Sequence, residues 1–247
     1  MQSESAKRHD HGDWRLSLDD HNLSSRMSSF NAFIRKLKQN SHHLFERTLL
    51  SPMDRKVLVK SSFESEPRSM IMLGSNNYLG FANHPQIKKS VTKAMNSFGI
   101  GMAGPSLLNG TGKLHRQLEE ELSDMKGHQD TCLFPSGYQA NLAIAQALIS
   151  PGDLVIYDEQ SHASFIRGLR PLMRKENKSR PRKFRHNQIS DLRMKLSSSL
   201  ISSGDCFVAC ESLYSMSGDI ANLYEINQLK KEFEFYFILD DAQIRQW

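Results

Sequence analysis

Short apolar segments alternate with helical segments over the second half of this 247-residue chain. The apolar segments are rich in β-branched and aromatic residues, whereas the segments between them repeat apolar residues at helical spacing. The predicted strands are "TCLF", "DLVIY", about 183–186, "DCFVAC" and "FYFIL", and the predicted helices are 136–149, 161–169, 188–202 and 222–233. Such alternation favours right-handed βαβ units. We therefore expect an α/β fold, with a mainly parallel sheet and helices on both faces.

The first half of the chain carries other patterns. Residues 1–29 are polar and predict a mobile N-terminal arm. For residues 30–69 we expect a helix over about 30–48, followed by short strands at "KVLVK" and "SMIML". Two further helices are predicted, one from Pro85 and one over about 112–126. No internal repeat or long linker is visible, so residues 70–247 are expected to form one large domain.

Composition limits the class of protein. With 38% hydrophobic and 24% charged residues, the chain is expected to be soluble and globular, and it has no apolar run of about eighteen residues that could span a membrane. The start, "MQSESAKRHDHGDW", lacks the apolar core of a signal peptide, which favours the cytoplasm. The three cysteines, Cys132, Cys206 and Cys210, lack the paired spacing of a zinc site, so we interpret them as packed thiols.

The net charge of +5 comes from one basic run at 167–186, which holds nine Lys and Arg residues against the single acid Glu176. Such a run could bind nucleic acid, an anionic membrane surface or an acidic acyl carrier protein. Stacking on nucleic-acid bases needs aromatic residues, and Phe184 is the only one in this run. Nucleic acid is therefore disfavoured as a partner, and a solvated charged loop is the leading interpretation.

Polar residues gather at the predicted carboxyl ends of the strands, where parallel α/β sheets bind their ligands. Ser136, Gly137 and Tyr138 open a helix after a predicted strand, so their amides can face a phosphate group. The other candidates at strand ends are His162, Glu211, Ser215 and Asp240. Each of them alone is as easily explained as a helix cap or a turn residue.

Taken together, these residues suggest one cofactor. A phosphate cradle, a flat ring and a buried carboxylate are the parts of a site for pyridoxal phosphate (PLP). The carboxylate would keep the pyridine nitrogen protonated, because an adjacent negative charge favours the charged form. A protonated ring is the electron sink that PLP chemistry requires.

Six motifs make the chain resemble the α-oxoamine synthases, PLP enzymes of fold type I that include 8-amino-7-oxononanoate synthase, glycine C-acetyltransferase, 5-aminolevulinate synthase and serine palmitoyltransferase. The resemblance covers about residues 70–243. The motifs are "GSNNYLGFANHP", "GIGMAGPSLLNGTGKLHRQLEEEL", "FPSGYQAN", "DEQSHAS", "ESLYSMSGDIANL" and "LDDA". The glycine stretch followed by "LHRQLE" is the part most specific to this family.

The resemblance implies a role for each matching position. The family reaction joins an amino acid to an acyl thioester, of coenzyme A or an acyl carrier protein, with loss of CO2, and the intact enzymes are homodimers. The implied roles are phosphate binding for Ser136, Gly137 and Tyr138, stacking on the ring for His162, polar contacts at the rim of the ring for Glu211 and Ser215, pairing with the pyridine nitrogen for Asp240, and substrate contact for Asn76.

Three departures from the family pattern modify this expectation. Gln243 stands where the family has a histidine near the cofactor, and it can donate a hydrogen bond but carries no charge. Ser106 stands where many relatives have arginine. The lysine that attaches the cofactor, and the small C-terminal domain, correspond to positions beyond Trp247, and the last lysine here, Lys231, matches no such role. We therefore expect an incomplete large domain that is inactive by itself but still binds PLP weakly.

Two alternatives remain open from the sequence. The chain could be a non-catalytic subunit that associates with a full-length homologue. It could also be a binding module whose basic run, 167–186, docks an acyl carrier protein.

Overall fold

The computed structural model describes residues 22–40, 46–173, 180–198 and 204–243. It divides into two compact units, Met1–Pro105 and Ser106–Trp247. This division falls within the segment 70–247. Each unit is therefore considered by itself.

The first unit begins with helix α2 (Leu23–Gln39), whose N-cap Asn22 accepts a hydrogen bond from the Ser24 backbone N–H. The helix predicted over 30–48 was thus wrong at both ends. It starts earlier because the Asn22 carboxamide caps it there, and its polar first turns are tolerated because only Leu37 is buried. Of the predicted N-terminal arm, residues 1–21 lie outside the described residues and the remainder is mostly helical.

Three antiparallel strands complete the regular part of the first unit up to residue 71. They are β1 (Arg47–Leu49), β2 (Lys56–Ser61) and β3 (Arg68–Ile71), in the order β1-β2-β3. Val57 and Val59 of β2 are buried and their neighbours are not, which is the alternation of a sheet covered on one face. The strands predicted at "KVLVK" and "SMIML" are confirmed.

The first unit ends with the short helix η2 (Phe81–Asn83) and with α3 (Pro85–Phe98). Pro85 occupies the first turn, where its missing N–H costs nothing, and the helix stops at Gly99 with φ of 78°. The helix predicted from Pro85 is confirmed, although α3 buries none of its residues.

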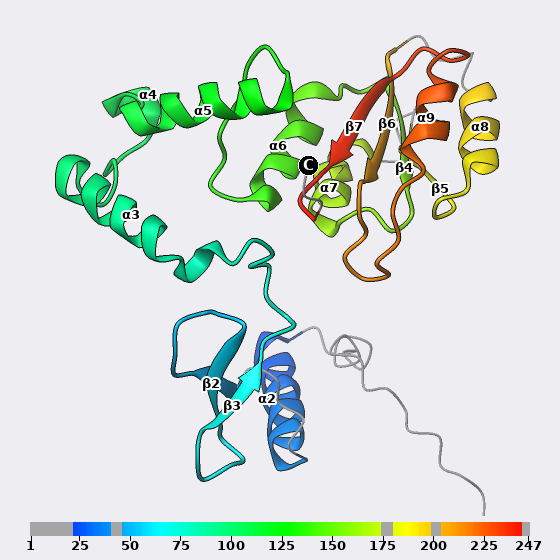
Figure 1. Ribbon diagram of the computed structural model, residues 1–247. Coiled ribbons are helices and arrows are strands. Elements are labelled where there is room, and N and C mark those ends of the chain that lie inside the picture. The colour runs from blue at the N-terminus through cyan, green and yellow to red at the C-terminus, as the bar shows by residue number, and fades with distance from the viewer. Residues whose placement is uncertain (1–21, 41–45, 174–179, 199–203, 244–247) are drawn as a thin grey trace, which may run out of the picture. The chain divides into compact units, whose positions relative to one another are not determined.

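The second unit starts with α4 (Ser106–Asn109), α5 (Lys113–Lys126) and α6 (Gly137–Leu148). It then alternates strands and helices as predicted: β4 (Leu154–Asp158), α7 (Ala163–Gly168) with η3 (Arg170–Met173), β5 (Arg182–Phe184), α8 (Ile189–Ser197), β6 (Cys206–Glu211), α9 (Leu223–Leu229) and β7 (Tyr236–Asp240). The sheet has the order β5-β4-β6-β7, and every pair in it is parallel (Figure 1).

One predicted strand of the second unit was wrong. The segment "TCLF" at 131–134 has no regular secondary structure and forms no ladder with another strand among the described residues. A strand exists only where a neighbour takes up its backbone hydrogen bonds, and apolar composition cannot guarantee such a neighbour. Phe134 is correspondingly exposed.

Helices cover both faces of the parallel sheet, which confirms the predicted fold class. Figure 1 shows α8 and α9 on one side of β4, β6 and β7, with α6 and α7 on the other. Alternate side chains of the strands enter two separate cores. One core joins Leu154, Ile156, Val208 and Cys210 to Leu192, Leu196, Ile226 and Leu229, and the other joins Val155, Tyr157, Phe207 and Ala209 to Ala145, Ile149, Phe165 and Leu169.

The cysteines of β6 pack as apolar residues. Cys210 is buried and Cys206 is partly buried against the same core. Burial raises the pKa of Cys206 to about 11 and that of Cys210 to about 12. Both thiols therefore stay protonated at neutral pH, which does not suit metal binding or redox chemistry.

Acidic residues end three neighbouring strands of this sheet. Asp158 ends β4, Glu211 ends β6 and Asp240 ends β7, with Glu211 and Asp240 directly paired in the register. We call this the carboxyl edge of the sheet. Among the described residues, no helix is both long enough and apolar enough to cross a membrane.

Candidate functional site

A pocket of about 570 Å³ opens at the carboxyl edge of the sheet. It is lined by Gln160, Ser161, His162, Ala163, Glu211, Tyr214, Ser215, Met216 and Ser217. Three residues predicted from two separate segments, His162, Glu211 and Ser215, thus come together in one cavity. The segments after β4 and after β6 supply its walls because these two strands are adjacent and parallel.

Asp240 is joined to His162 through two intermediate side chains. The Asn141 Nδ2 lies 2.6 Å from the Asp240 Oδ2 and 3.1 Å from the Ser164 Oγ. The Ser164 Oγ lies 2.6 Å from the Nδ1 of His162. The second oxygen of Asp240 accepts the Ala242 backbone N–H at 3.1 Å. The carboxylate and the imidazole are therefore held in a fixed relation to each other.

The N-terminus of α6 lies next to this network. The Ser136 Oγ caps the helix by accepting the Gln139 backbone N–H at 3.2 Å. The Tyr138 ring stands edge-on to the His162 ring, with 6.2 Å between the centroids. Ser136, Gly137 and Tyr138 are all exposed, so the amides at the start of this twelve-residue helix are accessible to an anion.

Close packing of α7 against α6 sets this geometry. A Cβ at Gly168 would stand 2.6 Å from the Cβ of Ala145, so a larger residue would push α7 away from α6. Because α6 carries Asn141 and α7 carries Ser164, the absent side chain at Gly168 keeps these two partners within hydrogen-bond distance.

Glu211 is a buried carboxyl group at the pocket, with 6% of its surface exposed. Burial, together with the negative charges of Asp240 and Asp158, raises its pKa to about 7, against the opposing effect of the His162 backbone N–H. Near neutral pH, Glu211 is therefore divided between its acid and its carboxylate, which is the condition for a group that gives or takes a proton.

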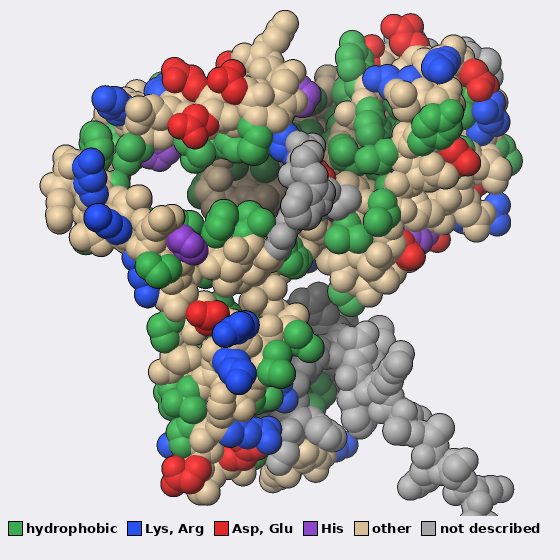
Figure 2. Space-filling view, in the orientation of Figure 1, with side chains coloured by type: hydrophobic (Ala, Val, Ile, Leu, Met, Phe, Trp, Pro, Cys, Tyr) green, Lys and Arg blue, Asp and Glu red, His purple; other side chains and the backbone are tan. Residues whose placement is uncertain are grey.

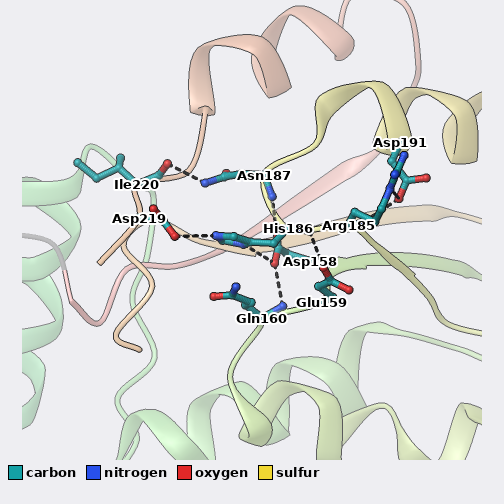
Figure 3. Close-up of polar contacts among 9 residues, drawn as sticks. All are labelled: Asp158, Glu159, Gln160, Arg185, His186, Asn187, Asp191, Asp219 and Ile220. Carbon is teal, nitrogen blue, oxygen red and sulfur yellow. Dashed lines mark hydrogen bonds and ion pairs between the residues drawn. The ribbon is translucent and has the colours of Figure 1, made fainter. Parts of the chain in front are cut away.

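A second network, at the side of the pocket, surrounds His186 (Figure 3). The His186 Nδ1 lies 2.9 Å from the buried Asp158 carboxylate and its Nε2 lies 3.2 Å from the Asp219 carboxylate. Carboxylates only accept hydrogen bonds, so both ring nitrogens donate and the ring is an imidazolium. Burial lowers the pKa of His186, but the hydrogen bonds and charges of Asp158 and Asp219 outweigh it, so that the pKa is raised.

This network holds the loop that carries Ser215. The Asn187 backbone N–H donates to Asp158 at 3.0 Å and the Asn187 side chain donates to the Ile220 carbonyl at 3.1 Å (Figure 3). The Tyr214 ring stands edge-on to His186 at 4.4 Å between centroids. The turn from Tyr214 to Ile220, which forms one wall of the pocket, is thus tied to the end of β4.

Two predicted site residues have less defined surroundings. Asn76 is exposed and belongs to the first unit, between β3 and η2. Gln243 is partly buried and follows Asp240 by three residues. Their roles remain predictions.

The basic run at 167–186 is only partly covered, since 174–179 lie outside the described residues. Within it, Arg182 donates to the Ser198 hydroxyl at 3.2 Å and Arg185 lies 3.9 Å from Asp191. Carrier-protein docking by this run also remains a prediction.

Several site residues escaped the sequence analysis. Asn141 and Ser164 stand within the motifs "FPSGYQAN" and "DEQSHAS", but nothing local shows that their side chains meet. Asp158 gave a signal that could have been used, because it follows the apolar run "LVIY" in the same way as Asp240 follows "FIL". Lys126, at the end of α5, was also unforeseen and lies 2.9 Å from Asp241, beside the end of β7.

Comparison with known proteins places the chain in a family. The profile of the family described as aminotransferase class I and II matches residues 68–243, more than half of the sequence. The chain therefore belongs to the aminotransferase class I and II family.

Its relatives within this class are α-oxoamine synthases, as the motifs indicated. Serine palmitoyltransferase of Sphingobacterium spiritivorum is 34% identical over 220 residues, which make up 89% of this chain and 52% of the relative. An 8-amino-7-oxononanoate synthase of Geotalea daltonii is 36% identical over 175 residues, or 71% of this chain and 43% of the relative. The chain spans about half the length of these curated relatives.

A solved structure agrees with this grouping. Serine palmitoyltransferase from S. paucimobilis, with a bound adduct of PLP and myriocin, has a TM-score of 0.77 at 29% identity. The match covers 89% of this chain and 53% of that chain.

Proposed function

We propose that this chain carries the PLP-binding part of an α-oxoamine synthase, an enzyme that condenses an amino acid with an acyl thioester and releases CO2. One observation carries the proposal: His162, Glu211 and Ser215 line a single pocket, and Asp240 is tied to His162 through Asn141 and Ser164. Four of the predicted residues are thereby brought to one edge of one sheet. Family membership and the PLP-bound relative support the same assignment.

The chemistry of the available groups fits PLP. The accessible amides at the start of α6 suit the phosphate, with Ser136, Gly137 and Tyr138 around it. The Asp240 carboxylate accepts two hydrogen bonds from the protein and has lone pairs left for a ring N–H. The buried Ser161 Oγ has no partner among the described residues, although it lines the pocket, so it has a hydrogen bond to offer a ligand.

Each residue then has a defined task. The Asp240 charge would hold a proton on the pyridine nitrogen, His162 would stack on the ring, and Ser215 would contact its rim. Glu211, with a pKa of about 7, accepts or donates a proton beside it. When bound, PLP supplies the electron sink that stabilises negative charge at the Cα of the amino acid.

The substrates are part of the proposal. We assign an amino acid and an acyl thioester of coenzyme A or of an acyl carrier protein, with Asn76 on the substrate side and Gln243 near the cofactor. These assignments follow the family motifs and rest on the PLP site described above.

We expect this chain to bind PLP without a covalent bond and to be inactive alone. Lys231 follows α9, which runs back from the carboxyl edge to the start of β7, so this lysine lies at the opposite edge of the sheet from Asp240.

A titration with PLP tests the proposal. The wild-type chain should bind PLP saturably, and Asp240→Asn and His162→Ala should each weaken binding about tenfold, the effect of ~1.4 kcal/mol. The matched control is Asp205→Asn, which removes an exposed carboxylate just before β6, at the other edge of the sheet. Absence of saturable binding, or equal affinities for the Asp240 and Asp205 variants, would refute the assignment. Borohydride treatment followed by mass spectrometry should find no lysine linked to the cofactor.

A second candidate, a non-catalytic subunit, is favoured by exposed apolar side chains of the second unit. Figure 2 shows hydrophobic side chains along α5 beside acidic ones. The exposed set in and before this helix is Leu107, Leu108, Leu114, Leu118 and Met125. Co-expression with a full-length α-oxoamine synthase decides between the two: a stoichiometric complex supports the subunit, whereas separate elution of the chain excludes it.

A further inference from the structure

Two groups set the direction of the hydrogen bonds around His162, because one of them can only donate and the other can only accept. The Ser164 backbone N–H lies 3.2 Å from the His162 Nδ1, and a backbone N–H can only donate. The His162 Nδ1 must therefore carry a lone pair and no proton. At the other end of the network, the Asp240 carboxylate can only accept, so the Asn141 side chain must present its NH2 group there.

These two ends also fix the donor and acceptor roles of the Ser164 hydroxyl in the middle of the network. The Ser164 Oγ is 2.6 Å from an Nδ1 without a proton, so the Ser164 hydroxyl donates its single hydrogen to that nitrogen. The lone pairs of the hydroxyl then accept the second N–H of Asn141 at 3.1 Å. Ser164 is fully buried, so water does not compete for these bonds. The Asn141 amide therefore donates in two directions, to Asp240 and to Ser164, and Ser164 in turn donates to His162.

We propose that Asn141 and Ser164 are positioning residues that lock His162 in the tautomer with its proton on Nε2. Two donors converge on Nδ1, so the ring offers a single N–H, on its exposed side. His162 thereby presents a hydrogen-bond donor to an oxygen of a molecule in the pocket, and cannot present an acceptor. The same Asn141 amide orients the Asp240 carboxylate, so one side chain aligns both groups.

The second histidine of the site supplies an internal contrast. His186 has a carboxylate at each ring nitrogen and must donate from both, whereas His162 has two donors at one nitrogen. The two rings, His162 lining the pocket and His186 beside it, are consequently held in different protonation states.

Nitrogen-15 NMR of histidine side chains in the whole chain tests this inference without any cofactor. The sequence has ten histidines, so the His162 signals are identified by their loss in His162→Gln. Wild-type His162 should show Nδ1 as an unprotonated nitrogen and Nε2 as a protonated one. Ser164→Ala should shift Nδ1 toward the protonated value as the tautomers mix, Ser164→Thr should restore the wild-type pattern, and Asn141→Ala should give a smaller shift.

The matched control is Ser161→Ala, which removes a neighbouring buried hydroxyl that has no hydrogen-bond partner among the described residues. It should leave the His162 signals unchanged. A protonated Nδ1 in the wild type, or equal spectra for the Ser164 and Ser161 variants when both are folded by circular dichroism, would overturn the inference.

The catalytic use of this donor rests on the proposed function, and the two can fail separately. Adding PLP should perturb the Nε2 signal of His162 in the wild type. A locked tautomer with no response to PLP would leave the positioning role intact and refute the cofactor site, whereas a PLP response with mixed tautomers would do the reverse.

Discussion

The two units bury their strands in different ways. All five residues of β4, in the second unit, are buried, whereas in β2 of the first unit only Val57 and Val59 are. The parallel sheet has helices on both faces, so β4 carries apolar residues at four consecutive positions before Asp158 at its carboxyl end. The antiparallel sheet is covered on one face and needs them at every second position.

The helices of the two units also differ in how many of their side chains are buried. In the second unit, α8 buries Leu192, Leu196 and even the charged Asp191, while α3 of the first unit buries nothing, although its sequence is the more strongly amphipathic of the two. Every buried charged side chain in the described part of the chain, namely Asp158, Asp191 and Glu211, belongs to the second unit. The lesson is that periodicity predicts a helix, but only a surface to pack against makes that helix contribute to stability, and only such a packed unit can hold buried charge.

The largest expected difference between the units lies in their apolar side chains. Leu192→Ala removes a fully buried side chain from the core of the second unit and should lower the free energy of unfolding by about 2–5 kcal/mol. Met95 of α3 is 45% exposed, so Met95→Ala should change the free energy of unfolding by less than about 0.5 kcal/mol. Urea denaturation of both variants measures the contrast. Equal losses would show that α3 is packed as firmly as α8.

A variant of Glu211 measures how much a buried acid lowers the free energy of unfolding of the second unit. The pKa of Glu211 is raised from 4.5 to about 7, so between these pH values the folded chain binds more protons than the unfolded chain and loses stability as the pH rises. At about 1.4 kcal/mol per pKa unit this amounts to roughly 3 kcal/mol. Glu211→Gln should therefore be more stable than the wild type above pH 7, by up to that amount, and nearly equal to it at pH 4.5.

Thermal denaturation at a series of pH values measures this effect. Glu225→Gln, which neutralises an exposed acid at the start of α9, is the matched control for the loss of one negative charge. If the Glu211 and Glu225 variants behaved alike, Glu211 would not be the buried acid described above.

The smallest effect is expected at His186. Because its folded pKa is raised, its ion pairs stabilise the fold fully below about pH 6.5, the ordinary value, and this contribution disappears as the pH rises through the folded pKa. His186→Gln should cost about 1–2 kcal/mol at pH 6 and less at pH 9. A constant cost for the His186 variant from pH 6 to pH 9 would argue against the imidazolium.

Much of the second unit was predictable because each of its elements has a local signature. The helices α6, α7, α8 and α9 and the strands β4 to β7 lie close to where the sequence pattern placed them, since β4, β6 and β7 each carry a continuous apolar run. The segment 131–134 has the same composition and is not a strand, because strand pairing depends on a neighbour that composition does not encode. The start of α2 was missed because one polar cap, Asn22, outweighed the apolar spacing.

In the candidate site, too, some residues could be predicted from the sequence and others could not. His162, Glu211, Ser215 and Asp240 could be found because motifs and strand ends are sequence properties. The hydrogen bond from Asn141 to Ser164 joins residues 23 positions apart, and that from Asn141 to Asp240 joins residues 99 positions apart. No local sequence pattern can therefore predict either bond. The same is true of His186, whose partners Asp158 and Asp219 lie 28 and 33 residues away.

By itself, therefore, the sequence determined which helices and strands the second unit contains, their order, and the acids that end its strands. These features depend on patterns of only a few neighbouring residues. Only the tertiary structure decided which donor meets which acceptor. The proton on His162 and the charge on His186 depend on side chains brought together by the packing of separate elements, and a hydrogen bond exists only when both of its partners are in place.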